Sequence, residues 1–116
     1  MTALRFPLTR LLPLLSLSLL AVPPLALAQD ATVRVVIQDH HFQPEELHAP
    51  AGRDLVIEVE NRDAAVEEFE SYDLDREQRV KPGETLKVRL AALSRGRYPF
   101  FGDFHRRTAQ GVLVVE

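Results

Sequence analysis

The stretch GRYPFFGDFHRRTAQGVLVV, residues 96–115, decides the fold class. Residues 96–101 and 111–115 are short apolar runs rich in aromatic and β-branched residues, which is typical of strands. The segment between them is polar and contains a single histidine, His105. The stretch therefore predicts two strands joined by a loop that presents this histidine.

Five more segments have the composition of strands. In residues 32–38 and 54–60 apolar and polar residues alternate, as they do in half-buried strands. Turn residues such as Asn61-Arg62-Asp63 and Lys81-Pro82-Gly83 separate the segments. Seven short strands without a convincing helix predict an all-β sandwich. The five segments are residues 32–38, 45–49, 54–60, 67–73 and 85–90.

The first 28 residues differ from the rest of the chain. Arg5 and Arg10 precede an apolar run, which ends at the small residues Ala26-Leu27-Ala28. This order is typical of a secretory signal peptide. Prolines and serines interrupt the run, which is shorter than the about 20 apolar residues of a membrane span. We expect cleavage before Gln29, a single domain over residues 29–116 in the periplasm, and no membrane span after cleavage; the alternative is an uncleaved anchor.

The expected domain is acidic and contains no cysteine. Both leader arginines are lost on cleavage, so 12 basic residues face 17 acidic ones, a net charge of 12 − 17 = −5. This charge disfavours nucleic acid and anionic lipid as partners and favours attraction of cations. The absence of cysteine excludes a disulfide and a metal thiolate, so packing must stabilise the domain.

The order of short motifs resembles that of the cupredoxins, and the resemblance covers residues 31–116. It implies a Greek-key β-sandwich and a copper site at one end. No single motif is specific, but the ordered set is. The matching motifs are Phe42-Gln43-Pro44, Ala51-Gly52, Asn61-x-Asp63, Pro82-Gly83, Gly96-x-Tyr98-x-Phe100 and the closing GVLVV of residues 111–115.

The copper ligands of the cupredoxins can be carried over by position. The first histidine falls on Glu67, the cysteine on Gly102, the second histidine on His105, and the axial methionine on Gln110. A blue-copper site depends on a short thiolate bond. We therefore expect that the chain is not a blue-copper electron carrier.

The segments EEFES, residues 67–71, and FFGDFHRRTAQG, residues 100–111, are similar to one branch, the EfeO-type cupredoxin-like proteins. Those proteins are found beside bacterial ferrous-iron permeases. The resemblance implies an exported domain that handles iron or copper for such a permease. The residues it implicates are Glu67, Glu68, His105 and Gln110.

In a sandwich of this kind residues 32–38 and 54–60 run parallel in one sheet, so the segments that follow them, 39–41 and 63–68, leave the sheet at the same end. If the loop of residues 102–110 closes that end too, carboxylates and imidazoles meet there. Period-two alternation turns Glu67 inward with Phe69, and Glu68 and Glu70 outward. Imidazole and carboxylate without sulfur suit Cu(II), Fe, Mn or Zn. We expect Glu67 and His105 to bind one ion as direct ligands and so to lie within about 10 Å of each other, with Asp103, His40 and His41 as candidates to complete the metal site.

Several alternatives remain open for these residues. His105 could be a hydrogen-bonded structural histidine, the glutamates a solvated acidic edge, and Gln110 a brace of its loop. Neighbours in a strand face opposite sides, so at most one of His40 and His41 faces the site.

At the level of function, the main alternative is a metal-free docking module of the permease system. A copper-dependent ferrous-iron oxidase ranks third, because the sequence offers no second redox centre. No hydrolase triad or phosphate-binding glycine loop is found.

Overall fold

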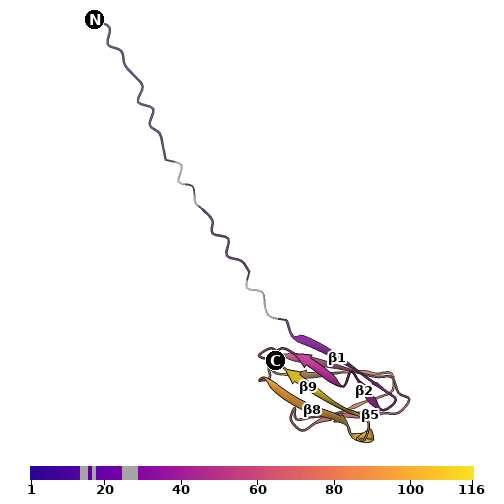
Figure 1. Cartoon of the computed structure of the whole chain (residues 1–116). Helices are drawn as coiled ribbons and strands as arrows, with labels where there is room; N and C mark the ends of the chain where they lie inside the picture. Colours follow the sequence, from indigo (N-terminus) through magenta and orange to yellow (C-terminus); the bar gives the residue numbers. More distant parts are fainter. Residues whose placement is uncertain (14–15, 17, 25–28) are drawn as a thin grey trace.

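The computed structural model describes residues 1–13, 16, 18–24 and 29–116. The strands all lie between Ala31 and Val115, and the described residues before Gln29 extend away from them (Figure 1). The expected cleavage motif Ala26-Leu27-Ala28 lies outside the described residues. In the part of the chain that the structure describes, no helix is long and apolar enough to cross a membrane.

Residues 31–115 form two packed sheets. One sheet has the strand order β2-β1-β4-β7 and the other β3-β9-β8-β5-β6. Strand β1 runs parallel to β4, and β3 parallel to β9, while the remaining pairs are antiparallel. The strands are β1 (Ala31–Gln38), β2 (His41–Gln43), β3 (Glu46–Ala49), β4 (Leu55–Asn61), β5 (Glu67–Ser71), β6 (Arg76–Val80), β7 (Thr85–Leu90), β8 (Gly96–Gly102) and β9 (Gln110–Val115), and a 3₁₀ turn η1 (Asp103–His105) follows β8.

Two of these strands, β2 and β6, were not among the seven expected from the sequence. Strand β2 has only three residues and pairs with the end of β1 after a turn in which Asp39 and His40 have positive φ. Strand β6 has one buried residue, Val80, and exposes most of its charged residues. Its sequence shows no apolar alternation, because β6 is an edge strand and most of its side chains are exposed to solvent. The sequence therefore underestimates the number of strands.

The ends of β1 and β4 meet, as expected from their parallel pairing. The Asp63 carboxylate accepts hydrogen bonds from the backbone nitrogens of Asp39 at 2.7 Å and His40 at 3.0 Å. Strand β5 begins, and β8 passes into η1, at this same end. We call this end of the sandwich the pole. The parallel directions of β1 and β4 place the ends of both strands at the pole.

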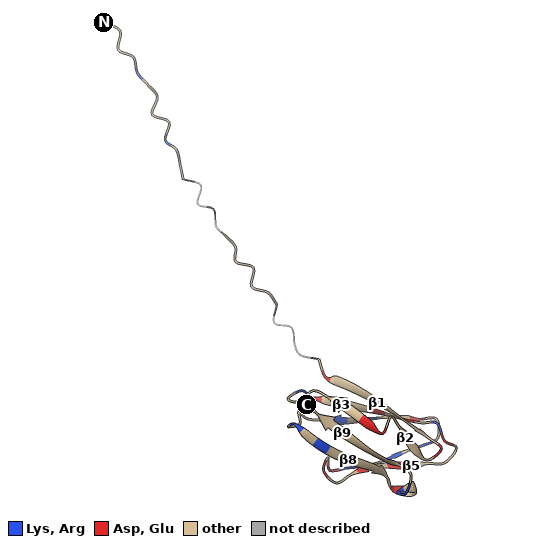
Figure 2. Cartoon of the chain, in the orientation of Figure 1, with Lys and Arg blue, Asp and Glu red and all other residues tan. Residues whose placement is uncertain are grey.

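The core contains a cluster of three phenylalanines. Phe42, Phe69 and Phe100 are each no more than 1% exposed. The ring of Phe100 lies 4.9 Å from that of Phe42 and 5.2 Å from that of Phe69, measured between centroids. Figure 2 marks the acidic and basic residues along the ribbon, where both signs occur in the strands and in the loops of the sandwich. Phe69 is buried, as the alternation of its segment predicts. Glu67 lies two residues earlier on β5 and therefore faces the same side of the sheet.

Candidate metal centre at the pole

Glu67 is a buried carboxylate at the start of β5, with 1% of its surface exposed. Its Oε1 accepts hydrogen bonds from the backbone nitrogens of Phe104 at 2.9 Å and Glu68 at 3.0 Å. Its Oε2 lies 2.5 Å from Nδ1 of His105. The side chain therefore joins β5 directly to η1, and the inward orientation expected for Glu67 is observed.

The contact between Glu67 and His105 determines what the imidazole can do. We assign the ring proton to Nδ1, because it faces a carboxylate whose other oxygen already accepts two N–H groups. In the neutral imidazole the lone pair then lies on Nε2. No buried side-chain nitrogen or oxygen among the described residues lacks a partner. Nε2 forms no hydrogen bond with these residues and is therefore accessible to solvent.

A second imidazole covers the first. The rings of His40 and His105 are stacked, with centroids 3.6 Å apart and an angle of 16° between planes. His41 is exposed on β2, opposite Gln38, and is not part of this stack. The expectation that at most one of the two neighbouring histidines faces the site agrees with this arrangement, and His40 is the one.

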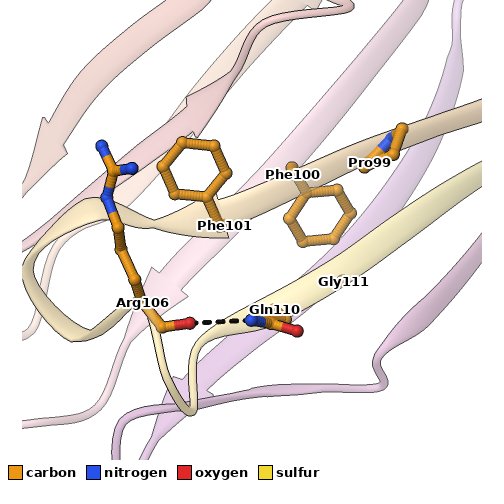
Figure 3. Close-up of a pocket in the computed structure, with 6 residues that line it drawn as sticks. All are labelled: Pro99, Phe100, Phe101, Arg106, Gln110 and Gly111. Atoms are coloured by element: carbon orange, nitrogen blue, oxygen red, sulfur yellow. Dashed lines mark hydrogen bonds between the residues drawn. The ribbon is translucent and has the colours of Figure 1, made fainter.

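Gln110 is not brought to the Glu67–His105 pair. It pairs with Phe101 across β8 and β9, so both side chains lie on the outer face of the sheet. Its Nε2 donates to the backbone oxygen of Arg106 at 2.9 Å, beside an open pocket of this face (Figure 3). The inward-facing neighbour is Ala109, which is fully buried. Gln110 therefore stabilises its loop by a hydrogen bond, which is the alternative to a role as axial metal ligand.

Glu68 and Asp103 belong to a separate acidic cluster. Carboxylate oxygens of Glu68, Glu70 and Asp103 lie within 4.8 Å of one another. Glu68 is only 6% exposed and forms an ion pair with Arg79 at 3.3 Å, so the expectation of a solvent-facing Glu68 is corrected. Glu68 does lie on the face opposite Glu67, but Arg79, its partner across the β5–β6 ladder, and Asp103 lie beside it on that face.

The charges of this cluster affect Glu77 and Arg106. The hydrogen bond and the negative charge of Glu68, followed by the charge of Glu70, raise the pKa of the Glu77 carboxyl. Asp103 accepts a hydrogen bond from Nε of Arg106 at 2.6 Å, and this bond raises the pKa of that guanidinium. Asp103 is therefore engaged with Arg106 rather than with His105.

Gly102 shows that a blue-copper site does not fit. A Cβ at this position would lie 2.7 Å from Cδ of Glu67 and 2.7 Å from Cβ of Ala109. The space that a cysteine side chain needs is thus filled by the Glu67 carboxylate. The outward Nε2 of His105, by contrast, suits a divalent transition metal.

Two residues of the Asn61-x-Asp63 motif hold the loop that leads into Glu67. The amide nitrogen of Asn61, which is fully buried, donates to the backbone oxygens of Ala65 and Val80, both at 2.9 Å. Its Oδ1 accepts from the backbone nitrogen of Asp63 at 2.9 Å. In the sequence, Asn61-x-Asp63 precedes the position that corresponds to the first copper-binding histidine of the cupredoxins. The hydrogen bonds by which Asn61 shapes the loop are visible only in the structure.

Comparisons with known proteins agree with this architecture. The family model described as "Cupredoxin-like domain" matches residues 11–115. An uncharacterised protein of Rickettsia prowazekii (strain Madrid E) is 43% identical over 83 residues, which are 72% of this chain and 66% of that protein. The chain thus spans just under two thirds of the length of that relative.

Solved structures show the same fold at low identity. Auracyanin A, a "blue" copper protein from Chloroflexus aurantiacus, is 18% identical with a TM-score of 0.65, over 76% of this chain and 100% of its own. A purple cupredoxin from Nitrosopumilus maritimus is 18% identical with a TM-score of 0.56, over 75% and 100%. The metal-binding domain of the Cu(I)-exporting ATPase CopA of Streptococcus pneumoniae D39 is 14% identical with a TM-score of 0.62, over 73% and 84%.

At these identities the solved structures show the fold alone, and they confirm the predicted Greek-key β-sandwich. The family model covers most of the chain, including all nine strands. The chain belongs to the family of cupredoxin-like domains.

Proposed function

We propose that this chain is an exported metal-binding domain that holds copper or iron at the pole and serves a ferrous-iron uptake permease. Nε2 of His105 is the proposed ligand atom. Glu67 supports it from behind without touching the ion. This assignment replaces the simpler expectation that Glu67 and His105 share one ion as direct ligands, because their own contact of 2.5 Å leaves no room for an ion between them.

The observation that carries the proposal is the buried carboxylate behind an accessible imidazole nitrogen. Histidines that bind metals commonly donate their other ring N–H to a carboxylate, which fixes the tautomer and makes the ligand nitrogen more basic. Glu67 is placed to do this for His105. When bound, a transition metal would supply a Lewis-acidic or redox-active centre at the surface of the pole.

Calorimetric titration of the purified protein with Cu(II) and with Fe(II) tests this. We expect saturable binding of at least one of the two ions and its loss in His105→Ala. Glu67→Gln should weaken binding by about 10–100-fold, as changes to outer-shell partners commonly do.

The matched control is His48→Ala, which removes an exposed histidine of β3 that pairs with Glu46 and Glu116. This variant should bind like the wild type. Binding that requires His48 and not His105 would refute the site.

Export and service to a permease rest on the leader-like N-terminus and on the similarity of residues 67–71 and 100–111 to EfeO-type proteins. Uptake of radioactive iron by cells that lack this protein tests the link. We expect reduced uptake, restored by the wild-type gene and not by His105→Ala. Undiminished uptake in the deletion strain would contradict it.

A metal-free docking module is the second candidate, and one observation favours it. The hydrogen-bonding groups at the pole have partners without an ion. The Glu67 carboxylate faces three N–H groups, and no buried polar side-chain atom of the described residues lacks a hydrogen-bond partner. In that case a Glu67→Ala, His105→Ala double variant that folds should still support iron uptake. A folded double variant that supports none would exclude this candidate.

A further inference from the structure

The pole offers a bound ion few donors from its own chain. Both oxygens of Glu67 and Nδ1 of His105 are used in contacts with each other and with backbone nitrogens. The carboxylate of Asp63 accepts two backbone N–H groups, and that of Asp103 faces Arg106. Nε2 of His105 forms no hydrogen bond with the described residues and is a donor open to an ion beside the ring of His40.

His40 cannot join His105 on the same ion in this arrangement. An imidazole binds a metal in the plane of its ring at about 2 Å from the nitrogen. The two rings lie face to face at 3.6 Å with only 16° between their planes. An ion in the plane of one ring therefore lies well out of the plane of the other. Each chain contributes one imidazole to one ion.

We propose that the ion at the pole is bound between two copies of this chain, each of which supplies Nε2 of its His105. The inference rests on the proposed function and adds the partner that completes the site. A single imidazole leaves most of the coordination positions of a transition metal open. A second copy related by a twofold axis supplies an identical donor, and twofold dimers are the commonest symmetric assemblies.

The surface around His105 suits contact with a second protein surface. Val66 is 39% exposed and Phe104 is 41% exposed, and they flank Glu67 and His105 in the sequence. The backbone nitrogen of Phe104 is bound to Glu67, and its ring lies 5.6 Å from the guanidinium carbon of Arg79. Within residues 29–116 the remaining large apolar side chain with such exposure is Tyr72. In a symmetric dimer the apolar pair of each chain would be covered as the two His105 rings approach.

Sedimentation velocity of the purified protein with and without Cu(II) tests the inference. We expect a monomer without copper, a dimer at one Cu(II) per two chains, and a return to monomer with excess chelator. Phe104→Ala should lower the dimer fraction at a given copper concentration. His48→Ala, far from the pole on β3, should leave the dimer unchanged.

Electron paramagnetic resonance of the copper-loaded protein identifies the donors. We expect hyperfine coupling to imidazole nitrogens of two chains, retained in His40→Ala. The His40→Ala result tests the inference even if His105→Ala does not fold. Loss of one of two nitrogens in His40→Ala would mean that both ligands come from one chain, and would overturn the inference.

The outcomes separate this inference from the proposed function. A monomer with one Cu(II) per chain overturns the dimer and leaves metal binding by His105 intact. No saturable binding of Cu(II) or Fe(II) at all defeats both. A dimer that persists in chelator shows that the contact does not need the ion, and this result also overturns the inference.

Discussion

At the scale of single residues, Glu67 and Gly102 depend on each other. The carboxylate of Glu67 occupies the space into which a side chain at residue 102 would project. In return, the missing side chain leaves room for the carboxylate to reach the backbone nitrogen of Phe104 and the ring of His105. The two positions that the cupredoxin pattern assigns to a histidine and a cysteine are thus packed against each other here.

Glu67→Gln should destabilise the domain by roughly 1–3 kcal/mol. The amide has one acceptor oxygen, whereas Glu67 now faces three donors, so at least one buried donor would meet an NH₂ group. Urea unfolding followed by circular dichroism measures the loss. The exposed Glu45 provides the control, because Glu45→Gln should change stability by less than about 0.5 kcal/mol. Equal stability of Glu67→Gln and wild type would show that these bonds contribute nothing.

Gly102→Ala should destabilise the domain by about 1–3 kcal/mol, the usual cost of an overpacked core. The added methyl group would lie 2.7 Å from both Cδ of Glu67 and Cβ of Ala109. In a Glu67→Ala background one of these two contacts is gone, so the loss caused by Gly102→Ala should be smaller. A double-mutant cycle by urea unfolding measures this coupling. Additive losses would mean that the two residues do not compete for the same space.

At the scale of elements, β5 carries two different environments on its two faces. Its inner face places Glu67 against η1, and its outer face places Glu68 and Glu70 with Asp103. The edge strand β6 adds Glu77 to the outer group, opposite Glu70 in the β5–β6 ladder. Opposed carboxylates in one ladder repel, and Arg79 offsets this only in part.

The outer face of β5 and β6 should make stability depend on pH through Glu77. Its pKa in the folded protein is raised above the ordinary value of 4.5 for a glutamate, first by the hydrogen bond to Glu68 and then by the negative charges of Glu68 and Glu70. A carboxyl with a raised pKa in the folded state stabilises the protein below its unfolded pKa, and this contribution is lost as the pH rises through the folded pKa.

Glu77→Gln should therefore become more stable relative to wild type as the pH rises from about 4 through the raised pKa of Glu77. Urea midpoints of both proteins at a series of pH values, with Glu45→Gln as the control, measure the difference. A difference between Glu77→Gln and wild type that does not vary with pH would show that Glu77 is not coupled to Glu68 and Glu70.

At the scale of the whole molecule, the sandwich is self-contained. All core residues lie between Val35 and Val115, and the described residues before Gln29 contribute none. The Arg53 side chain donates a hydrogen bond to the backbone oxygen of Gln29 at 2.6 Å, and this bond holds the segment just before β1 against the sandwich. The stability of the sandwich is therefore expected not to depend on the residues before Gln29.

Export should remove residues 1–28 and leave the stability of the sandwich unchanged. The intact mass of the protein recovered from the periplasm should correspond to a chain that begins at Gln29. A protein of residues 29–116 should unfold at the same urea concentration as the full chain, because the core is complete within it. Recovery of the full-length mass in a membrane fraction would favour the uncleaved anchor.

The pattern of the sequence was enough to predict the fold class and the inward orientation of Glu67 and Phe69. These features follow from local alternation and strand direction, which are properties of neighbouring residues. The two missed strands, β2 and β6, are short or mostly polar, so alternation could not reveal them.

The division of roles among the residues at the pole depends on tertiary contacts. Glu67 is bonded directly to His105, His40 stacks on that ring, Gln110 lies on the outer face, and Glu68 is paired with Arg79 of β6. Most of these contacts join residues more than ten positions apart in the chain, whereas the bond from Gln110 to Arg106 spans four positions. Patterns of neighbouring residues do not encode contacts across such separations.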